Sequence, residues 1–161
     1  MPKLVKNNLI VDSDGWTEVT SIEAFKATEK PLIPLSMLTS HLDDVLTTKT
    51  CGLLFNEDDD FDLLKEKLTD QPVIVFKFGK FADGRFFSFA RELREQRGYT
   101  GDIRATGDFM PDQVAFLRRC GFTSFDCRTD AEAAIAPTLQ SIISEAYQAD
   151  VIHPDPLFRR K

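Results

Sequence analysis

Three basic residues stand where apolar segments of the chain give way to loops or helices: Lys77, Arg85 and Arg104. Lys77 and Arg104 interrupt apolar runs near the ends of predicted strands, and a charged group there is costly unless it is paired or faces a polar cleft. Arg85 follows Gly84, where a helix is predicted to begin, and the first N–H groups of a helix favour anions. We therefore expect Lys77, Gly84, Arg85 and Arg104 to form a cradle for a small anion.

The same cations have a second interpretation, in which acidic residues of the chain neutralise them. Two of these acidic residues, Asp83 and Asp108, are also our candidates for a general acid or base. The residues alone leave both interpretations open, a ligand cradle or a salt-bridge network. The acidic residues within reach of the cations are Asp83, Asp108, Asp112 and Asp126.

The segment from Gly79 to Gly84 has the glycine spacing of a phosphate-binding loop and lies between a predicted strand and a predicted helix. A Walker loop continues with Lys and then Ser or Thr, whereas this chain continues with Arg85 and Phe86. A G-x-G-x-x-G motif follows none of the predicted strands, so the signature of a nicotinamide or flavin site is missing. We predict neither nucleotide hydrolysis nor a nucleotide cofactor.

Metal and iron–sulfur chemistry find no motif in the sequence. The chain has three cysteines without a C-x-x-C pair, whereas an iron–sulfur cluster usually takes four thiolates. The two histidines, His41 and His153, are too far apart to form an i,i+4 ligand pair. We therefore predict that the protein binds no metal and no cofactor. The odd number of cysteines fits a reducing compartment, so we expect the protein to be cytoplasmic.

Cys120 is the cysteine with the most reactive surroundings in the sequence. Arg118 and Arg119 precede it, and nearby cations lower a thiol pKa. Gly121 ends the predicted helix immediately afterwards, and the negative end of a helix raises a thiol pKa. A structural role is favoured over a redox role.

The charge balance argues against binding to nucleic acids. The net charge is −6 and the isoelectric point is about 4.9, whereas nucleic-acid binders usually show a basic face. Between Lys77 and Arg104, however, seven basic residues outnumber four acidic ones. An acidic run over residues 57–62 compensates, and we interpret it as helix N-terminal charge rather than as a metal site. Apolar runs are far too short to span a membrane.

Short apolar runs alternate with helical patterns along the chain. This alternation predicts a mostly parallel α/β sheet of about five βα units, arranged as a partial barrel or in doubly wound order. We expect a single domain over residues 1–161, with its core in 31–150. The predicted strands cover residues 32–35, 51–55, 73–78, 102–106 and 122–127, and the predicted helices cover 21–26, 36–46, 60–68, 84–97, 111–121 and 130–149.

The first thirty residues are predicted to form a β-hairpin appendage that turns at Asp14-Gly15, because Asp-Gly favours tight hairpin turns. The core is expected to be rich in phenylalanine, since the chain has 14 Phe against two Tyr and one Trp. Phe81 and Phe87 do not fit the core-facing positions and are candidates for contact with a neighbouring helix or with a partner. The phenylalanines assigned to the core are Phe55, Phe76, Phe86, Phe89, Phe116 and Phe122.

One series of spaced residues is dense from about Phe78 to Phe125 and looser on both sides. It consists of Phe81-Ala82-Asp83-Gly84-Arg85, Ser88, Ala90-Arg91, Leu93-Arg94, Arg97-Gly98-Tyr99, Gly101, Arg104-Ala105, Gly107-Asp108, Asp112-Gln113 and Arg119-Cys120-Gly121-Phe122. This series resembles an uncharacterised bacterial family whose members are often described as oxidoreductases probably involved in sulfite reduction.

The resemblance implies a role beside sulfite reductase and other enzymes of sulfur assimilation, because proteins of this kind are found associated with those enzymes. Arg85, Arg104 and Asp112 occupy matching positions, and Gln113 and Cys120 are carried over as supporting residues. At Lys77-Phe78-Gly79 the chain departs from the family, whose members tend to show an acidic or polar residue followed by Phe-Pro. A sulfur oxyanion or a phosphorylated sulfur donor would suit the predicted cradle.

Three hypotheses about function follow. The first is an accessory protein of assimilatory sulfite reduction that binds sulfite reductase, another sulfur-assimilation enzyme or a small anion. The second is an enzyme that acts on an anionic small molecule at the carboxyl ends of the strands. The third is a homodimeric scaffold that uses Phe81 or Phe87.

Overall fold

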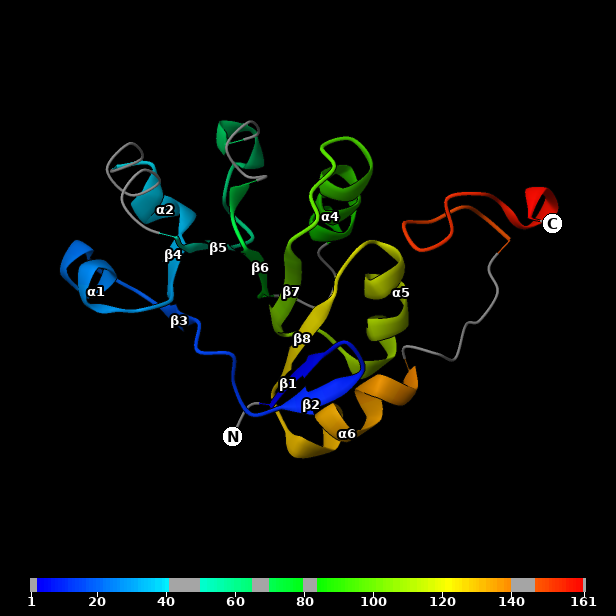
Figure 1. Ribbon diagram of the computed structural model, residues 1–161, viewed down its shortest axis with the longest axis horizontal. Helices are drawn as coiled ribbons and strands as arrows, with labels where there is room; N and C mark the ends of the chain where they lie inside the picture. The colour runs from blue at the N-terminus through cyan, green and yellow to red at the C-terminus, as the bar shows by residue number, and fades with distance from the viewer. Residues whose placement is uncertain (1–2, 41–49, 65–69, 80–83, 140–146, 161) are drawn as a thin grey trace.

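A single curled sheet organises the computed structural model, which describes residues 3–40, 50–64, 70–79, 84–139 and 147–160. The strand order is β2-β1-β8-β7-β6-β5-β4-β3, and each strand from β3 to β8 runs parallel to the next. The strands form an arc with the helices outside it, so the sheet is a half-barrel (Figure 1). Of the two predicted arrangements, the partial barrel is the one observed.

The strands coincide closely with the apolar runs of the sequence. The predicted strands at 32–35, 51–55, 73–78 and 102–106 correspond to β4 to β7, and the one at 122–127 to β8. A sixth parallel strand, β3, lies in the segment that was predicted as the second arm of the N-terminal hairpin, and it pairs with β4 instead. The bounds are β1 Lys3–Lys6, β2 Leu9–Val11, β3 Thr17–Glu18, β4 Pro31–Pro34, β5 Gly52–Phe55, β6 Val73–Phe78, β7 Asp102–Gly107 and β8 Ser124–Cys127.

The predicted N-terminal hairpin around Asp14-Gly15 is not observed, and a different hairpin precedes it in the chain. β1 and β2 pair antiparallel around Asn7 and Asn8, which both have positive φ, and asparagine tolerates this conformation in tight turns. Asp14 and Gly15 lie instead in the connection that runs to β3, which pairs in parallel with β4. The N-terminal segment therefore supplies strands at both ends of the sheet, with β1 antiparallel to β8.

Within the described residues, five α-helices and several 3-10 turns lie between the strands or follow the last one. The predicted Ser21 cap is confirmed, since its hydroxyl accepts a hydrogen bond from Ala24 N at 3.1 Å, but the cap of α2 is Pro34 rather than Ser36. The predicted helix at 60–68 begins as the 3-10 turn η1, and its remainder lies outside the described residues. The bounds are α1 Ile22–Ala27, α2 Leu35–Leu38, η1 Phe61–Leu64, α4 Arg85–Glu95, η3 Pro111–Gln113, α5 Val114–Arg119, α6 Asp130–Leu139 and η4 Leu157–Arg159.

The main hydrophobic core lies between the convex face of the sheet and the helices. Phe76 in β6 is fully buried and lies at its centre, with Phe55, Phe86 and Phe122 at ring-centroid distances of 5.5, 5.0 and 5.7 Å. Phe116 is the exception among the predicted core residues, because it is 50% exposed on α5. No helix within the described residues is long and apolar enough to cross a membrane.

Phe87 and Phe116 form a contact on the outer surface, with ring centroids 5.2 Å apart. Phe87 is half-buried and also packs against Phe78 at 5.8 Å. Phe81, the other residue predicted to meet a partner, lies outside the described residues.

Gly107 ends β7 in a conformation that only glycine adopts easily. Its φ is 87°, and a Cβ at this position would collide with the Phe78 carbonyl oxygen, which accepts a hydrogen bond from Asp108 N at 2.7 Å. We expect Gly107→Ala to lower the free energy of unfolding by about 2–3 kcal/mol, from strain at positive φ and from overpacking. Urea denaturation measures this change.

Gly84→Ala is the matched control for that measurement. Gly84 has a φ of −85°, and an added Cβ would meet no described atom within 4 Å. Alanine there should change stability little, because the restriction of the unfolded chain opposes the loss of a favoured N-cap residue. Equal stability of the two variants would contradict the close approach of β6 and β7 at Gly107.

Candidate functional site

The concave face of the half-barrel carries the polar side chains of the parallel strands. Register places Val75 of β6 beside Arg104 of β7, and Arg104 beside Ser124 of β8. One level closer to the carboxyl ends of the strands, Lys77 lies beside Thr106. Because side chains alternate along a strand, these residues point away from the phenylalanine core and into the curve of the sheet.

A cavity of about 230 Å³ opens on this face, and we call it the concave pocket. Its apolar wall consists of Trp16, Leu32, Leu54 and Val75. Its polar lining consists of Glu18, Lys77, Arg104, Thr106 and Asp126, which come from β3, β6, β7 and β8. Convergence of polar groups from several strands beside an apolar wall is typical of small-molecule sites. Lys77, Thr106 and Asp126 are each the next-to-last residue of their strand, and barrel enzymes bind their ligands at the carboxyl ends of the strands.

An ion pair between Lys77 and Glu18 crosses the pocket. Lys77 Nζ lies 3.4 Å from Glu18 Oε2, although β6 and β3 are separated by two other strands. On a flat sheet three strand spacings would amount to roughly 14 Å, so the curl of the sheet brings the two side chains together. Both side chains are nearly half exposed, at 47% and 45%, and such pairs contribute at most about 1 kcal/mol.

Asp126 is a pocket carboxylate whose ionised form its surroundings disfavour. Its Oδ2 accepts a hydrogen bond from Thr106 Oγ1 at 3.1 Å. Burial raises the pKa of the Asp126 carboxyl and the charge of Asp14 adds to this, while the hydrogen bond from Thr106 and the charge of Arg104 lower it; the balance is a raised pKa. A carboxyl with a raised pKa in a cleft is suited to hold or transfer a proton.

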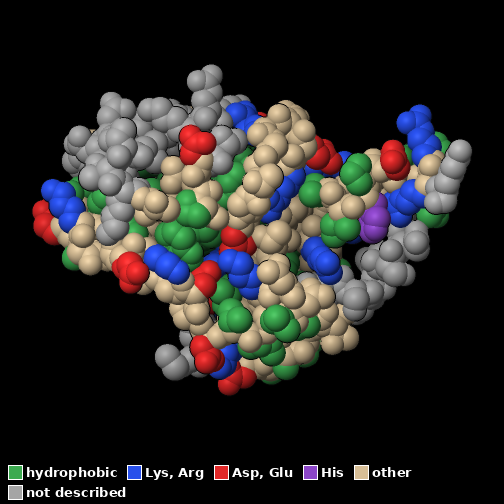
Figure 2. All heavy atoms as spheres, viewed as in Figure 1, with side chains coloured by type: hydrophobic (Ala, Val, Ile, Leu, Met, Phe, Trp, Pro, Cys, Tyr) green, Lys and Arg blue, Asp and Glu red, His purple; other side chains and the backbone are tan. Residues whose placement is uncertain are grey.

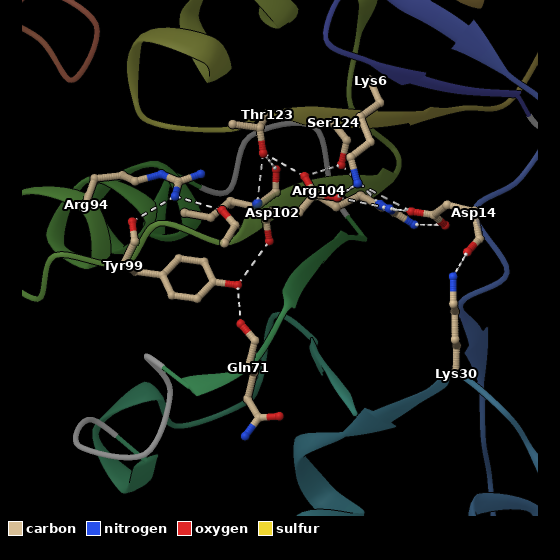
Figure 3. Close-up of polar contacts among 12 residues, drawn as sticks. Lys6, Asp14, Lys30, Gln71, Arg94, Tyr99, Asp102, Arg104, Thr123 and Ser124 are labelled. Atoms are coloured by element: carbon tan, nitrogen blue, oxygen red, sulfur yellow. Dashed lines mark hydrogen bonds and ion pairs between the residues drawn. The ribbon is translucent and has the colours of Figure 1, made fainter. Parts of the chain in front are cut away.

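Arg104 is buried in a network of paired charges at the amino ends of the strands (Figure 3). Its guanidinium forms an ion pair with Asp14, donates to Asp102 Oδ2 at 3.0 Å and donates to Ser124 Oγ at 3.1 Å. Lys6 Nζ lies 3.1 Å from Asp102 and 3.7 Å from Asp14. We call these four charged residues, Lys6, Asp14, Asp102 and Arg104, the Arg104 network.

The Arg104 network holds its charges in place. Burial would raise the pKa of Asp102, but hydrogen bonds from Thr123 and Ser124 and the charges of Arg104 and Lys6 hold this pKa below its usual range. In the view of Figure 2, basic and acidic side chains lie next to one another near the centre of the molecule. Internal pairing is thus observed for Arg104, with Asp14 and Asp102 as partners in place of the four acidic residues predicted.

The structure does not bring Arg85 and Gly84 to the concave pocket. Gly84 precedes the first turn of α4 on the helix-covered side, and Arg85 lines a separate hollow between that turn and η1. Carboxylates surround that hollow, including Asp60, Asp62 and Glu92. Of the predicted cradle, only Lys77 and Arg104 share a pocket.

The remaining predicted residues lie apart from the pocket lining. Asp108 forms an exposed ion pair with Arg128 at 2.6 Å, and Asp112 is exposed at the start of η3. The Gln113 side chain accepts a hydrogen bond from Met110 N at 2.9 Å, which caps this turn. Asp83 lies outside the described residues.

Cys120 is buried at the end of α5 and is a free thiol. Burial raises its pKa to about 11, although Arg91 and Arg119 act in the opposite direction. The thiol is therefore protonated at neutral pH, which supports the structural role. Within the described ranges, no group of three or more His, Cys, Asp or Glu side chains is placed to hold a metal ion.

Arg94, one of the residues behind the family resemblance, ties α4 to two loops. Its guanidinium donates to the carbonyl oxygens of Tyr99 and Gly101, both at 2.8 Å, and twice to that of Gly121, at 3.0 and 2.9 Å. Gly121 has a φ of 111°, and a Cβ there would lie 2.6 Å from Arg94 Cγ. Arg94, Tyr99, Gly101 and Gly121 are therefore connected by one set of hydrogen bonds, and we call these four residues the Arg94 joint.

A family model described as a bacterial protein of unknown function, DUF934, matches residues 52–158. The chain belongs to this family. The DUF934 region contains Lys77, Arg104, Thr106 and Asp126, whereas Glu18 precedes it and comes from the opposite wall of the pocket. No curated protein matches the chain significantly. The predicted membership of an uncharacterised bacterial family is confirmed.

Three residues of the pocket did not emerge from the sequence as site residues: Trp16, Glu18 and Thr106. Trp16 and Glu18 were assigned to the second arm of a hairpin, and only the curl of the sheet brings them opposite Lys77. Thr106 follows Arg104 by two residues, so strand alternation could have placed it on the same face. Asp126 was considered only as a partner for the cations.

Replacing Asp126 by asparagine is expected to raise the melting temperature at neutral pH by about 2–4 °C, which corresponds to ~1 kcal/mol for a chain of this size. The raised pKa means that folding disfavours the ionised carboxylate, whereas asparagine can accept the Thr106 hydrogen bond without a charge. Thermal unfolding followed by circular dichroism measures the shift.

The pH dependence of that gain has a defined sign. Because the folded pKa of Asp126 lies above the unfolded one, the penalty is complete above the folded pKa, and as the pH falls it declines between the folded and the unfolded pKa and vanishes below both. The gain of the variant should therefore shrink toward acid pH. Asp108→Asn, which alters an exposed carboxylate, is the control, and an equal gain there would contradict the assignment.

Proposed function

We propose that this protein binds a small anionic molecule in the concave pocket and thereby serves assimilatory sulfite reduction as an accessory protein. The observation that supports this most directly is the convergence of Glu18, Lys77, Thr106 and Asp126 around one cavity at the carboxyl ends of the parallel strands. The resemblance to a family described with sulfite reduction supplies the pathway. A sulfur oxyanion or a sulfonate matches both.

Lys77 is the anchoring cation of this proposal. It is the single exposed residue of β6, whose other five residues are buried, because the concave face at this level is open. Its ion pair with Glu18 is exposed and weak, so the acidic group of a ligand can compete with Glu18 for the lysine ammonium group. Arg104 contributes to the wall of the pocket but keeps its own buried partners.

An enzymatic form of the same proposal gives Asp126 a chemical task. A ligand anchored at Lys77 lies next to Thr106, which hydrogen-bonds to Asp126. The raised pKa of Asp126 is suited to a group that transfers a proton to or from the ligand. Asp126 then replaces Asp83 and Asp108 as the candidate acid or base.

Fluorescence of Trp16 tests this proposal directly, because it is the only tryptophan of the chain and it lines the pocket. We expect sulfite and methanesulfonate to change its emission in a saturable way. Lys77→Ala should raise the dissociation constant about 10- to 100-fold, the loss expected for a hydrogen bond to a charged group. Lys26→Ala, which removes an exposed lysine from α1, should bind like the wild type.

Growth of a deletion strain tests the pathway. Without the gene, growth on sulfate or sulfite as the sole sulfur source should slow, and growth on cysteine should not. The wild-type gene and the Lys26→Ala gene should restore growth, whereas Lys77→Ala should not. Unchanged growth of the deletion strain on sulfate and sulfite would contradict the role in sulfite reduction.

A further inference from the structure

The charges around the concave pocket favour a ligand that carries a positive group as well as a negative one. Arg104 is neutralised by Asp14 and Asp102, which Lys6 balances in part, so the Arg104 network carries two positive and two negative charges. Lys77 is balanced by Glu18. Asp126 remains, and within the described residues its carboxylate accepts a hydrogen bond from a neutral hydroxyl, that of Thr106. The pocket thus has one carboxylate more than it has cations.

The Lys77–Glu18 pair limits which ligands can enter without loss. An anion that binds Lys77 leaves the Glu18 carboxylate without its cation, and an amine that binds Glu18 leaves Lys77 without its anion. A ligand that carries both charges compensates both ends. Because the two side chains are nearly half exposed and 3.4 Å apart, their own pair is weak enough to be divided in this way.

Asp126 supplies a second acceptor for a positively charged group. Lys77 and Asp126 lie on β6 and β8, on either side of Thr106 in β7, so their strands are roughly 10 Å apart. A molecule with an acidic group and an amine two or three bonds apart can reach from one side chain to the other. Asp126 and Glu18 both line the pocket and are both acceptors for the amine.

The size and the apolar wall of the pocket narrow the ligand further. A volume of about 230 Å³ lies below the roughly 300–1,000 Å³ of pockets for drug-sized ligands. It suits a molecule of a few heavy atoms. Leu32, Leu54, Val75 and Trp16 offer contact to a short aliphatic or thiol-bearing portion.

We infer that the ligand of the concave pocket is a small zwitterion, an amino acid or aminosulfonic acid, whose acidic group binds Lys77 and whose ammonium group binds Asp126 and Glu18. This inference rests on the proposed function, since it names the ligand class of the same site. It adds that a positive group is required beside the negative one. The observation that supports the inference is the Lys77–Glu18 pair, in which both charges need a partner when a ligand separates them.

Matched ligand pairs test the inference through Trp16 fluorescence and calorimetry. The pairs are 2-aminoethanesulfonate with ethanesulfonate, glycine with acetate, and cysteine with 3-mercaptopropionate. In at least one pair, the amine-bearing member should bind 10-fold or more tightly than its amine-free partner. Asp126→Asn and Glu18→Gln should each reduce this ratio at least threefold, whereas Asp108→Asn should leave it unchanged. Asp126→Asn is expected to fold, because it removes a buried charge.

The outcomes separate the inference from the proposed function. Amine-free anions that bind as tightly as their partners in all three pairs, with affinity lost in Lys77→Ala, overturn the zwitterion and leave the anion site standing. A preference for the amine that persists in Asp126→Asn and Glu18→Gln also overturns the assignment. If neither these compounds nor sulfite bind, the proposed function falls and the inference falls with it.

Discussion

Replacing Arg104 by alanine is expected to lower the free energy of unfolding by about 3–5 kcal/mol, because it leaves buried carboxylates without their cation. The side chain is 6% exposed and contacts Asp14, Asp102 and Ser124 together. Such a loss is a large part of the total stability of an ordinary domain. Urea denaturation followed by circular dichroism measures it, with Arg91→Ala on the surface of α4 as the control.

A second variant shows whether the loss comes from charge pairing. Removing Asp14 together with Arg104 leaves Lys6 opposite Asp102, 3.1 Å apart. The double variant should therefore lose less stability than the sum of the two single variants, by about 1–3 kcal/mol. If Arg104→Ala instead kept its melting temperature and lost ligand binding, Arg104 would be a ligand group and the structural role would be wrong.

Arg94→Ala should cost about 2–4 kcal/mol, because three carbonyl oxygens lose their donor. The guanidinium makes four hydrogen bonds of 2.8–3.0 Å, to Tyr99, Gly101 and Gly121. Burial lowers the pKa of Arg94, so the fold keeps a partly desolvated cation that these carbonyls solvate. Thermal and urea unfolding measure the loss.

The shape of the guanidinium distinguishes this joint from a simple charge. Arg94→Lys keeps the charge but cannot reach three carbonyl groups in different directions, so it should recover less than half of the lost stability. Arg91→Ala, which breaks only the exposed pair with Glu95, should change stability by less than 0.5 kcal/mol. Full recovery by lysine would contradict the joint.

Much of the fold could be predicted because local patterns determine it. The apolar run of β6 is buried on both faces except at Lys77, and Ser21 caps α1 as its side chain predicts. The curl of the sheet could not be predicted, because it depends on how six strands stagger against one another. The turn at Asn7 and Asn8 was missed because Asp14-Gly15 is the stronger hairpin signal in the same segment.

The site was predicted only in part, for a related reason. Lys77 and Arg104 stand out as charges within apolar strands, and the structure places both in the concave pocket. The partner of Arg104, Asp14, is 90 residues away in a connection that crosses to the far end of the sheet. Arg85 was added to the cradle through its helix N-terminus, which lies on the other face of the sheet.

Several of the residues that carry the family resemblance stabilise the fold and do not line the concave pocket. Arg94, Tyr99, Gly101 and Gly121 form one joint at the end of α4, where Tyr99 also donates to Gln71 O at 2.8 Å. Residues with this spacing therefore indicate a shared fold and give no information about a reaction. Lys77, at which the chain departs from the resemblance, lines the pocket.

The most direct test of the concave pocket is a nuclear magnetic resonance titration of isotope-labelled protein with sulfite and with 2-aminoethanesulfonate. We predict that the largest shifts fall on the Trp16 indole N–H and on the backbone amides of Lys77, Thr106 and Asp126. Shifts confined instead to the start of α4, around Arg85 and Ser88, would place the anion at the helix terminus and contradict the concave pocket as the functional site.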